Sequence, residues 1–252
     1  MPRRATNSSA PGSGAAPIPR PGEIFCPVGR ALDLIGDRWT LVLLRHFLSG
    51  PKGFQEMRKR TGIAPRVLSS RLRQMVEDGF IEPLASDAGR SGYAVTERGR
   101  TLEPIVAAIA RWWVDHAMED HAAVTGGFTE TSPQSILESL PFLLHEERAR
   151  GVERIFEIRL TGTGGGVWTV QIHDGECHVE PGFAERADVR YTADARSWCA
   201  VALGLRDAHE ALEQGLLIKD GGRDSLDRYF HQIGSPPRSR SDGRSEEQRS
   251  TP

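Results

Sequence analysis

The chain has 252 residues, which is enough for two ordinary domains or for one large one. Its 32 basic and 34 acidic residues almost balance, but they are distributed unevenly. Residues 23–121 carry a formal charge of +1, whereas residues 130–232 hold 11 basic and 18 acidic side chains, a charge of −7. This asymmetry predicts two modules with different partners, and it argues against DNA or an anionic membrane as the partner of the second module.

The cysteines and the N-terminal residues give no sign of export or membrane insertion. Cys26, Cys177 and Cys199 are odd in number and lack CxxC spacing, so we expect a cytoplasmic protein without a disulfide framework or zinc site. No metal or other cofactor is predicted. Residues 1–22 are rich in proline, glycine and serine and have no apolar segment, which predicts a disordered arm rather than a signal peptide. No apolar run of about 18 residues occurs, so we expect no membrane span.

Changes in periodicity divide the chain into modules. Helical periodicity dominates from about 26 to 121, a joint containing threonine and glycine follows, and strand-like and helical stretches come after it. The predicted fold class is therefore α+β. The predicted organisation is a disordered arm (1–22), a helical module (23–121), a linker (122–132), a mixed module (133–233) and a disordered tail (234–252).

Four helical segments are expected in the first module. Pro27 stands where the first segment would begin, and Asp37 is the expected cap of the second. Pro65 opens the fourth segment, which has Gly79 at its C′ position. The segments read CPVGRALDLIG, DRWTLVLLRHFLSG, FQEMRKRTG and PRVLSSRLRQMVEDG.

The fourth segment has one apolar face and one basic face. Its apolar residues recur at helical spacing and are expected to face a core: Leu68, Leu72, Met75 and Val76. Between Lys52 and Arg73 there are seven basic residues and a single acid, Glu56. Two short helices with such a face on the second are typical of a helix-turn-helix, in which Arg and Gln read base edges and Ser and other cations contact phosphates. The predicted DNA contacts on these helices are Arg58, Lys59, Arg60, Arg66, Ser69, Ser70, Arg71, Arg73 and Gln74.

A β-hairpin is expected directly after this helix. The segments FIEPLA and SGYAVT alternate in polarity around SDAGR, so Arg90 would lie at the tip and contact phosphate or the minor groove. A helix-turn-helix followed by such a hairpin is the winged variant. Thr96 is then the expected N-cap of one long helix over 97–120.

That long helix carries an apolar stripe with two adjacent tryptophans. The stripe could pack on its own module, or it could form a dimer interface with the first helix of a partner subunit. The second interpretation is favoured because twofold-symmetric DNA readers must span two half-sites. The predicted interface residues are Leu102, Ile105, Val106, Ile109, Trp112 and Trp113.

Over about residues 24–118 the chain resembles the HxlR-type winged helix-turn-helix regulators. The resemblance rests on Cys-Pro at the first helix, GDRWTLVLLR, GFQEM, PRVLSSRL with DGF after it, and YAVTERG. It implies a cytoplasmic, homodimeric, DNA-binding transcriptional regulator. Ala64 stands where a serine commonly precedes the recognition helix, which predicts a weaker cap for that helix.

Cys26 has two interpretations. The resemblance implies a possible redox sensor, since some members of the family sense oxidants or electrophiles through a cysteine at this position, and a helix N-terminus activates thiols. Alternatively, Cys26 is a small, inert residue buried in the dimer interface.

The clearest signal in the second module is a hairpin within WTVQIHDGECHVEPG. Asp174-Gly175 is typical of a two-residue type I′ turn, which fixes the register of the strands. Because the two histidines then lie on separate rungs of one face and the cysteine on the other, metal binding is not expected. The expected pairs are Ile172–Cys177 and Val170–Val179 on one face, and His173–Glu176 and Gln171–His178 on the other.

The remaining elements of the second module surround this hairpin. A strand at 155–160 ends in TGTGGG, which no helix follows, so a phosphate loop is not expected. ADVRYTAD is a third strand, and ARSWCAVALGL and AHEALEQG are short helices. LLIKDGGRDSLDRYFHQI reads as a strand, a turn and a final helix.

Over about residues 135–232 the chain resembles the sterol carrier protein-like fold. The resemblance rests on WTVQIHDG, on ADVRYTAD leading into a helix, and on HEALEQGLLIKDG. It implies a five-stranded sheet and helices around an apolar tunnel for a hydrophobic small molecule. The aromatic and leucine residues that could line this tunnel could equally be plain core residues. They are Phe142, Phe156, Trp168, Trp198, Leu203, Tyr229 and Phe230.

Together these features predict a homodimeric DNA-binding regulator, a repressor, whose second module binds a hydrophobic effector. The alternative is a hydrophobic-ligand carrier in which the winged module serves only for dimerisation, and the cluster of cations at 52–73 argues against it. An enzyme is not expected, since no Ser/His/Asp set, phosphate loop or dinucleotide fingerprint is present.

Overall fold

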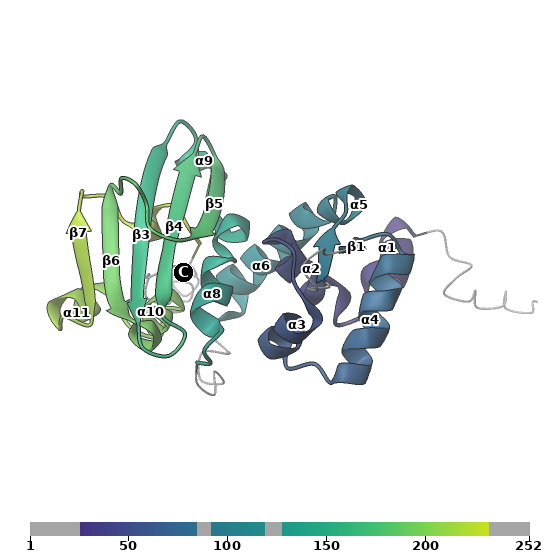
Figure 1. The fold of residues 1–252 in the computed structure, drawn as a ribbon. Helices are drawn as coiled ribbons and strands as arrows, with labels where there is room; N and C mark the ends of the chain where they lie inside the picture. The colour runs from purple at the N-terminus through teal and green to yellow at the C-terminus, as the bar shows by residue number, and fades with distance from the viewer. Residues whose placement is uncertain (1–25, 85–91, 119–127, 232–252) are drawn as a thin grey trace, which may run out of the picture.

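The computed structural model describes residues 26–84, 92–118 and 128–231. Figure 1 shows a helical half, α1 to α6, beside a half in which helices pack against a five-stranded β-sheet. Helices and strands are thus combined without regular alternation, which confirms the predicted α+β class. No helix in the described ranges is long and apolar enough to cross a membrane.

The four predicted helices of the first half are present. They are α1 (Pro27–Ile35), α2 (Thr40–Leu48), α3 (Phe54–Thr61) and α4 (Pro65–Glu77). Gly62 ends α3 at a φ of 66°, in the left-handed region that glycine adopts without strain. The expected start of α2 at Asp37 is corrected to Thr40. The Asp37 carboxylate instead closes the preceding turn, accepting from the backbone nitrogen of Trp39 at 2.9 Å.

The apolar face of α4 is packed as predicted. Leu68, Leu72 and Met75 are buried, and Val76 packs half-buried against the same core. Ala64 precedes α4 without any side-chain capping bond, as its residue type predicts. The core on which α4 packs also holds Leu43, Leu44 and Phe47 of α2, Met57 of α3, and Ile63.

The predicted hairpin consists of β1 (Ile81–Leu84) and β2 (Gly92–Val95), which pair antiparallel. Its base is widened by Lys52, whose backbone nitrogen donates to the Tyr93 carbonyl at 3.1 Å and whose carbonyl accepts from Tyr93 at 3.0 Å. The loop between α2 and α3 is therefore joined to the wing. The predicted tip, with Arg90, lies outside the described residues.

The single long helix predicted at 97–120 is wrong. The structure has α5 (Glu97–Arg100) and α6 (Glu103–His116), separated by a turn. Pro104, in the first turn of α6, has no N–H to donate and its ring would clash within a continuous helix, so the helix restarts there. Thr96 caps α5 as predicted, since its Oγ1 accepts from the backbone nitrogen of Gly99 at 3.0 Å.

The second half contains the expected five-stranded sheet, in the order β5-β4-β3-β6-β7. β3 and β6 run parallel and every other neighbouring pair is antiparallel. The strands are β3 (Glu153–Thr161), β4 (Gly166–His173), β5 (Glu176–Pro181), β6 (Val189–Asp194) and β7 (Leu217–Gly221). The helices are α8 (Ser132–Leu137), η3 (Leu140–Leu143), α9 (Glu146–Ala149), α10 (Ala195–Ala202), α11 (Ala208–Glu213) and η4 (Leu226–Arg228).

The predicted register of the β4–β5 hairpin is confirmed. Ile172 lies opposite Cys177, and His173 lies opposite Glu176. Asp174 and Gly175 both have positive φ, at 44° and 88°, as a type I′ turn requires. The predicted final helix is corrected, because the described residues there form only the short 3₁₀ turn η4.

The segment 137–142 contributes to both hydrophobic cores. Leu137 and Leu140 are fully buried in the core under the sheet. Phe142, 4% exposed, lies in the core of the helical half, because η3 packs against α6. Phe142 was predicted to line a tunnel in the second module, and it lies instead in the core of the helical half.

Candidate nucleic-acid interface and apolar cavity

The outward face of α4 presents unpaired cations. Arg66 and Arg73 are exposed, and neither has an ion-pair partner among the described residues. Ser69 and Ser70 lie exposed between them. Since Leu68 and Leu72 fix which side of the helix is buried, this face is presented rigidly to solvent. Arginines on such a face can reach guanine edges or phosphates.

Two further predicted contacts on α4 already have partners. Arg71 Nε lies 3.5 Å from Asp37 Oδ1, in a pair whose side chains remain partly exposed. Gln74 Nε2 donates to Asp78 Oδ1 at 3.1 Å. Both partners lie at the surface, where such pairs contribute little and exchange readily with other ligands. These two side chains therefore need to release a carboxylate before they can contact DNA.

The three basic residues at the end of α3 point in different directions. Arg58 is exposed and unpaired within the described part of the chain. Lys59 forms an ion pair with Glu130. The Arg60 side chain is only 3% exposed, and its guanidinium bonds to Glu56 at 2.8 Å and to Glu138 at 2.9 Å. Arg60, one of the predicted DNA contacts, therefore points into the contact between the two halves and not toward the outward face.

Lys52 is also buried, at 5% exposure, with Nζ 3.8 Å from Glu138. Two of the seven cations counted along residues 52–73 thus face inward.

Arg38, which sequence reasoning missed, lies on the outside instead. It is exposed at the start of α2, beside the Asp37–Arg71 pair. Its position directly before an apolar helix is the sequence feature that could have identified Arg38 as a cation at the surface.

The apolar stripe on α6 is divided between two surroundings. Leu102 and Val106 pack into the core of their own half. The other four are exposed: Ile105 at 38%, Ile109 at 50%, Trp112 at 59% and Trp113 at 38%. A shallow groove of about 410 Å³ runs along this side and is lined by Pro104, Ile105, Ala108, Ile109 and Trp112. Val28 and Leu32 of α1 are exposed as well.

Cys26 is exposed and caps α1, and its Sγ accepts from the backbone nitrogen of Gly29 at 3.4 Å. Cys177 and Cys199 are buried, and burial raises the pKa of each thiol to about 12. Only Cys26, of the three, is therefore placed for reaction with a solute.

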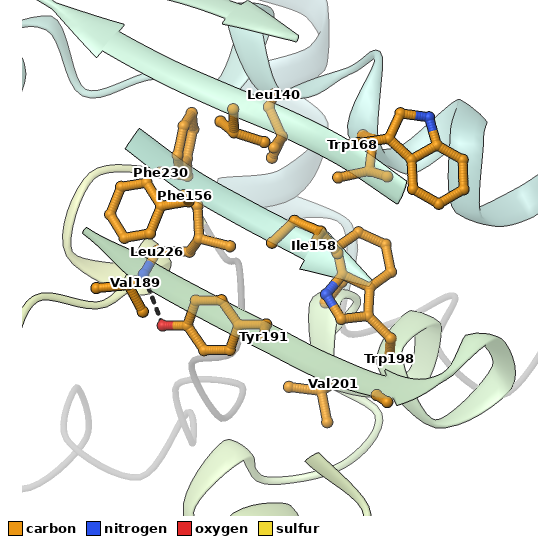
Figure 2. Close-up of a cluster of buried hydrophobic side chains, with 14 of the residues drawn as sticks. Leu140, Phe156, Ile158, Trp168, Val189, Tyr191, Trp198, Val201, Leu226 and Phe230 are labelled. Carbon is orange, nitrogen blue, oxygen red and sulfur yellow. Dashed lines mark hydrogen bonds between the residues drawn. The ribbon is translucent and has the colours of Figure 1, made fainter. Parts of the chain in front are cut away.

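The interior under the sheet is filled rather than hollow. Figure 2 shows Phe156, Trp168, Trp198 and Phe230 packed together with aliphatic side chains, and each is at most 7% exposed. Tyr229 belongs to the same core, whereas Leu203 is half-buried at the end of α10. Five of the aromatic residues expected to line a tunnel thus belong to the core under the sheet.

A small apolar cavity lies between β6, β7, α10 and η4. Its volume is about 40 Å³, and of the predicted lining residues only Trp198 touches it. A dry cavity of roughly 150 Å³ is needed to hold a molecule the size of benzene. The cavity as it stands therefore cannot hold a sterol or lipid. Its lining residues are Tyr191, Trp198, Val201, Ala202, Ala208, Leu217, Leu226 and Asp227.

The helical half, with two helices joined by a short turn and followed by a two-stranded wing, has the architecture of a winged helix-turn-helix. Residues 34–121 match the family model described as HxlR-like helix-turn-helix. The transcriptional regulator YdeP of Bacillus subtilis is 40% identical over 90 residues, which cover 34% of this chain and 70% of YdeP. The chain belongs to the HxlR-like helix-turn-helix family. Its second half, at residues 136–221, matches the SCP-2 sterol transfer family.

Other proteins are similar over a comparable share of this chain. An uncharacterised helix-turn-helix-type transcriptional regulator of Mycobacterium tuberculosis is 42% identical over 87 residues, 34% of this chain and 55% of that protein. The chain thus spans about half the length of the mycobacterial relatives it matches. YybR of Bacillus subtilis is 38% identical over 36% of this chain and 76% of YybR. The solved structure of the redox regulator HypR in its oxidised form is 38% identical, covers 35% of this chain and 94% of that chain, and gives a TM-score of 0.33.

Proposed function

We propose that this protein is a DNA-binding transcriptional regulator in which the module at 23–121 reads DNA and the module at 133–233 modulates it. The observation that carries the proposal is the outward face of α4, where Arg66 and Arg73 are exposed and unpaired. The relatives of this module bear the name of transcriptional regulators. The proposed contacts are Arg58, Arg66, Ser69, Ser70 and Arg73, with Arg38 and Arg71 at the edge.

The proposal includes a homodimer formed through α6. Ile109 and Trp112 are half-exposed and border an apolar groove, and such a surface is costly to leave in water. A twofold pairing there would present two copies of α4 to two half-sites about one helical turn of DNA apart.

The effector part of the proposal concerns the cavity beside Trp198. Its wall is almost wholly apolar, which suits a hydrophobic molecule. Because its volume is only about 40 Å³, α10, α11 or η4 must move before a ligand larger than a small fragment can bind. We propose that binding there releases the regulator from DNA, so that the protein acts as a repressor. A lipid carrier is the weaker candidate, since the interior under the sheet is packed with side chains.

The proposal is tested by selecting duplexes from a random DNA library with the full chain. We expect enrichment of a sequence with two related half-sites, and a dissociation constant that rises by about 10³-fold between 50 and 200 mM salt. Retention of DNA that is independent of both sequence and salt would exclude a sequence-reading function. Light scattering of the same preparation checks the dimer.

A further inference from the structure

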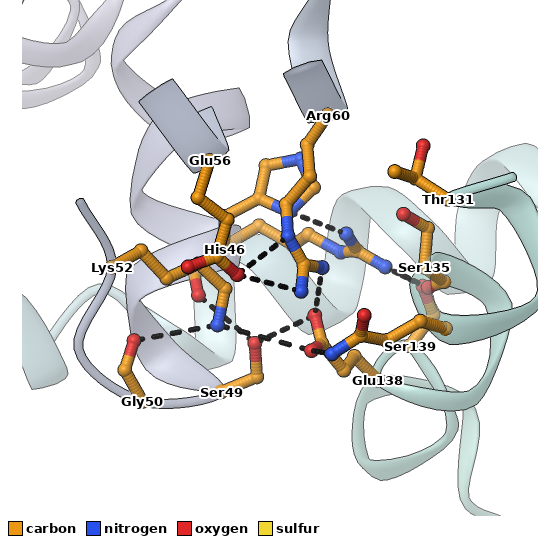
Figure 3. Close-up of polar contacts among 12 residues, drawn as sticks. His46, Ser49, Gly50, Lys52, Glu56, Arg60, Thr131, Ser135, Glu138 and Ser139 are labelled. Carbon is orange, nitrogen blue, oxygen red and sulfur yellow. Dashed lines mark hydrogen bonds and ion pairs between the residues drawn. The ribbon is translucent and has the colours of Figure 1, made fainter. Parts of the chain in front are cut away.

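A cluster of charged side chains is buried where the two halves meet. Figure 3 shows His46 of α2, Lys52 of the following loop and Arg60 of α3 gathered around Glu138, which directly follows α8. Arg45 of α2 lies beside His46 in the same cluster. His46 is 6% exposed, Lys52 5% and Glu138 9%. Every cation here comes from the winged half, whereas Glu138 comes from the segment that leads into the sheet half.

Glu138 bonds to the winged half and to its own helix α8. Its Oε2 accepts from Arg60 Nη1 at 2.9 Å and from Ser49 Oγ at 2.9 Å. Its Oε1 accepts from Gln134 Nε2 at 2.9 Å and lies 3.8 Å from Lys52 Nζ. One carboxylate therefore holds the end of α2, the following loop and the end of α3 together.

The cations exceed the anions in this cluster. Arg45 donates to the Ser135 carbonyl, to Ser139 Oγ and to His46 Nδ1, none of which is charged. Burial lowers the pKa of Arg45 to about 10. Burial, reinforced by the neighbouring cations, lowers the pKa of His46 to about 3, so that its ring is neutral.

Among the described residues of this cluster, Glu138 is therefore the only buried carboxylate, since the side chain of Glu56 is 44% exposed. Removing its charge would leave buried cations without compensation, which proteins tolerate poorly.

The segment that carries Glu138 is anchored on both sides. Leu137, the preceding residue, is fully buried in the core under the sheet, and Phe142 lies in the winged core. α8 packs against α10, and α10 contributes Trp198, Val201 and Ala202 to the apolar cavity. The cavity-lining helix α10 therefore packs directly on α8, the helix that Glu138 follows.

The winged side of the cluster leads to both DNA-reading elements. Lys52 is paired through its backbone with Tyr93 in β2 of the wing. Arg60 lies at the end of α3, just before the turn into α4. The wing and the start of α4 are thus each next to a residue, Lys52 or Arg60, whose side chain lies beside or bonds to Glu138.

We propose that Glu138 is the coupling contact of this protein, through which the packing of the sheet half sets the position of α3 and of the wing. The contacts of Glu138 with the winged half, and of its segment with the core under the sheet, support the mechanical coupling. The effect of this coupling on DNA binding rests on the proposed function. Coupling between the two halves is measured directly, by hydrogen exchange and by a double-mutant cycle.

The first experiment is hydrogen exchange of the full chain, compared among wild type, Glu138→Gln, Glu138→Asp and the control Glu147→Gln. Glu147 is exposed and has no ion-pair partner within the described ranges. We expect exchange in peptides covering 50–62 and 92–96 to accelerate about tenfold in E138Q, less in E138D, and not in E147Q. If E138Q does not fold, E138D carries the comparison. Equal exchange in E138D and wild type would then overturn the proposal, as would equal exchange in a folded E138Q and wild type.

The second experiment is a double-mutant cycle with Val201→Ala, which perturbs the cavity wall on α10. With Glu138 present, V201A is expected to accelerate exchange at 54–61 at least threefold. In the E138Q background, or in E138D if E138Q does not fold, the same change is expected to have a smaller effect there. An effect of V201A that is equal in both backgrounds, or absent from both, contradicts the proposal. DNA enters neither experiment, so failure of the proposed function is seen separately, as a lack of enriched DNA.

Discussion

The basic residues of the winged half lie in two regions of opposite character. On the outward face of α4, Arg66 and Arg73 are exposed and without partners among the described residues. Between α2, α3 and α8, Arg60 and Lys52 are buried around Glu138. All four come from one stretch of 22 residues that looks uniformly basic. A charge count along the sequence therefore overestimates the cationic surface, because partners distant in sequence turn some cations inward.

The comparison also separates two roles for arginine. An exposed arginine can exchange water for phosphate at little cost, and its removal leaves the fold intact. A buried arginine is part of the fold, and its removal leaves a carboxylate unpaired.

The largest expected effect is on stability, from Arg60→Ala. We expect a loss of about 3–5 kcal/mol in the free energy of unfolding, because Glu138 and Glu56 lose their shared guanidinium. Arg58→Ala, two residues earlier on the same helix, is the matched control. It should change stability by less than about 0.5 kcal/mol and reduce the salt slope of DNA binding by about 1. Urea unfolding and fluorescence anisotropy measure the two quantities. Comparable stabilities of R60A and R58A would contradict the distinction between buried and exposed arginines.

DNA affinity should respond most to Arg66→Ala and Arg73→Ala. Each substitution is expected to cost about 1–3 kcal/mol of binding, roughly 5- to 150-fold in dissociation constant, with no loss of stability. Arg150→Ala in the sheet half, also exposed and without an ion-pair partner in the described part of the chain, is the control. If R150A weakens binding of the selected duplex as much as R66A, then α4 is not the reading helix.

The buried charge cluster around Glu138 should also make the stability of the protein depend on pH, because it contains His46. His46 has a folded pKa of about 3, below the ordinary value of 6.5, so between these pH values only the unfolded chain binds the proton. Stability therefore falls as the pH falls below 6.5, by about 2 kcal/mol between pH 7 and pH 5. Urea unfolding at both pH values measures it. In His46→Gln this component should vanish, and an unchanged pH dependence in that variant would assign the effect to other groups.

The smallest expected effect concerns the pair Lys59–Glu130, which is exposed and yet joins the two halves. Surface pairs contribute at most about 1 kcal/mol, so Glu130→Gln should barely alter stability. Freed from its partner, Lys59 should raise DNA affinity by up to about fivefold. Anisotropy at low and high salt tests this, with Glu147→Gln as the control. A fall in affinity would show that Glu130 positions Lys59 rather than competing for it.

Local rules predicted much of the fold. Asp174-Gly175 fixed a register that the structure confirms pair by pair. The spacing of Leu68, Leu72 and Met75 identified the buried side of α4, and therefore its free side. The break before α6 could also have been predicted, since Pro104 stands in the interior of the proposed helix.

The remaining errors concern contacts between residues distant in the chain. In the sequence, Arg60 cannot be distinguished from its neighbour Arg58. Its partner Glu138 is 78 residues away, and no residue near Arg60 indicates that pairing. Phe142 looks like part of the second module, yet it completes the core of the first. The aromatic residues of the second module were recognised as apolar, but sequence does not tell whether such residues line a cavity or fill it.

The sequence by itself determined the four helices of the first half, the β4–β5 turn and the buried face of α4, because these depend on backbone geometry and on residues a few positions apart. The tertiary structure alone decided which cations remain at the surface, where the two halves join, and how little space remains under the sheet. Those outcomes depend on packing volume and on the pairing of buried charges, and both are set by side chains that folding brings together from distant parts of the chain.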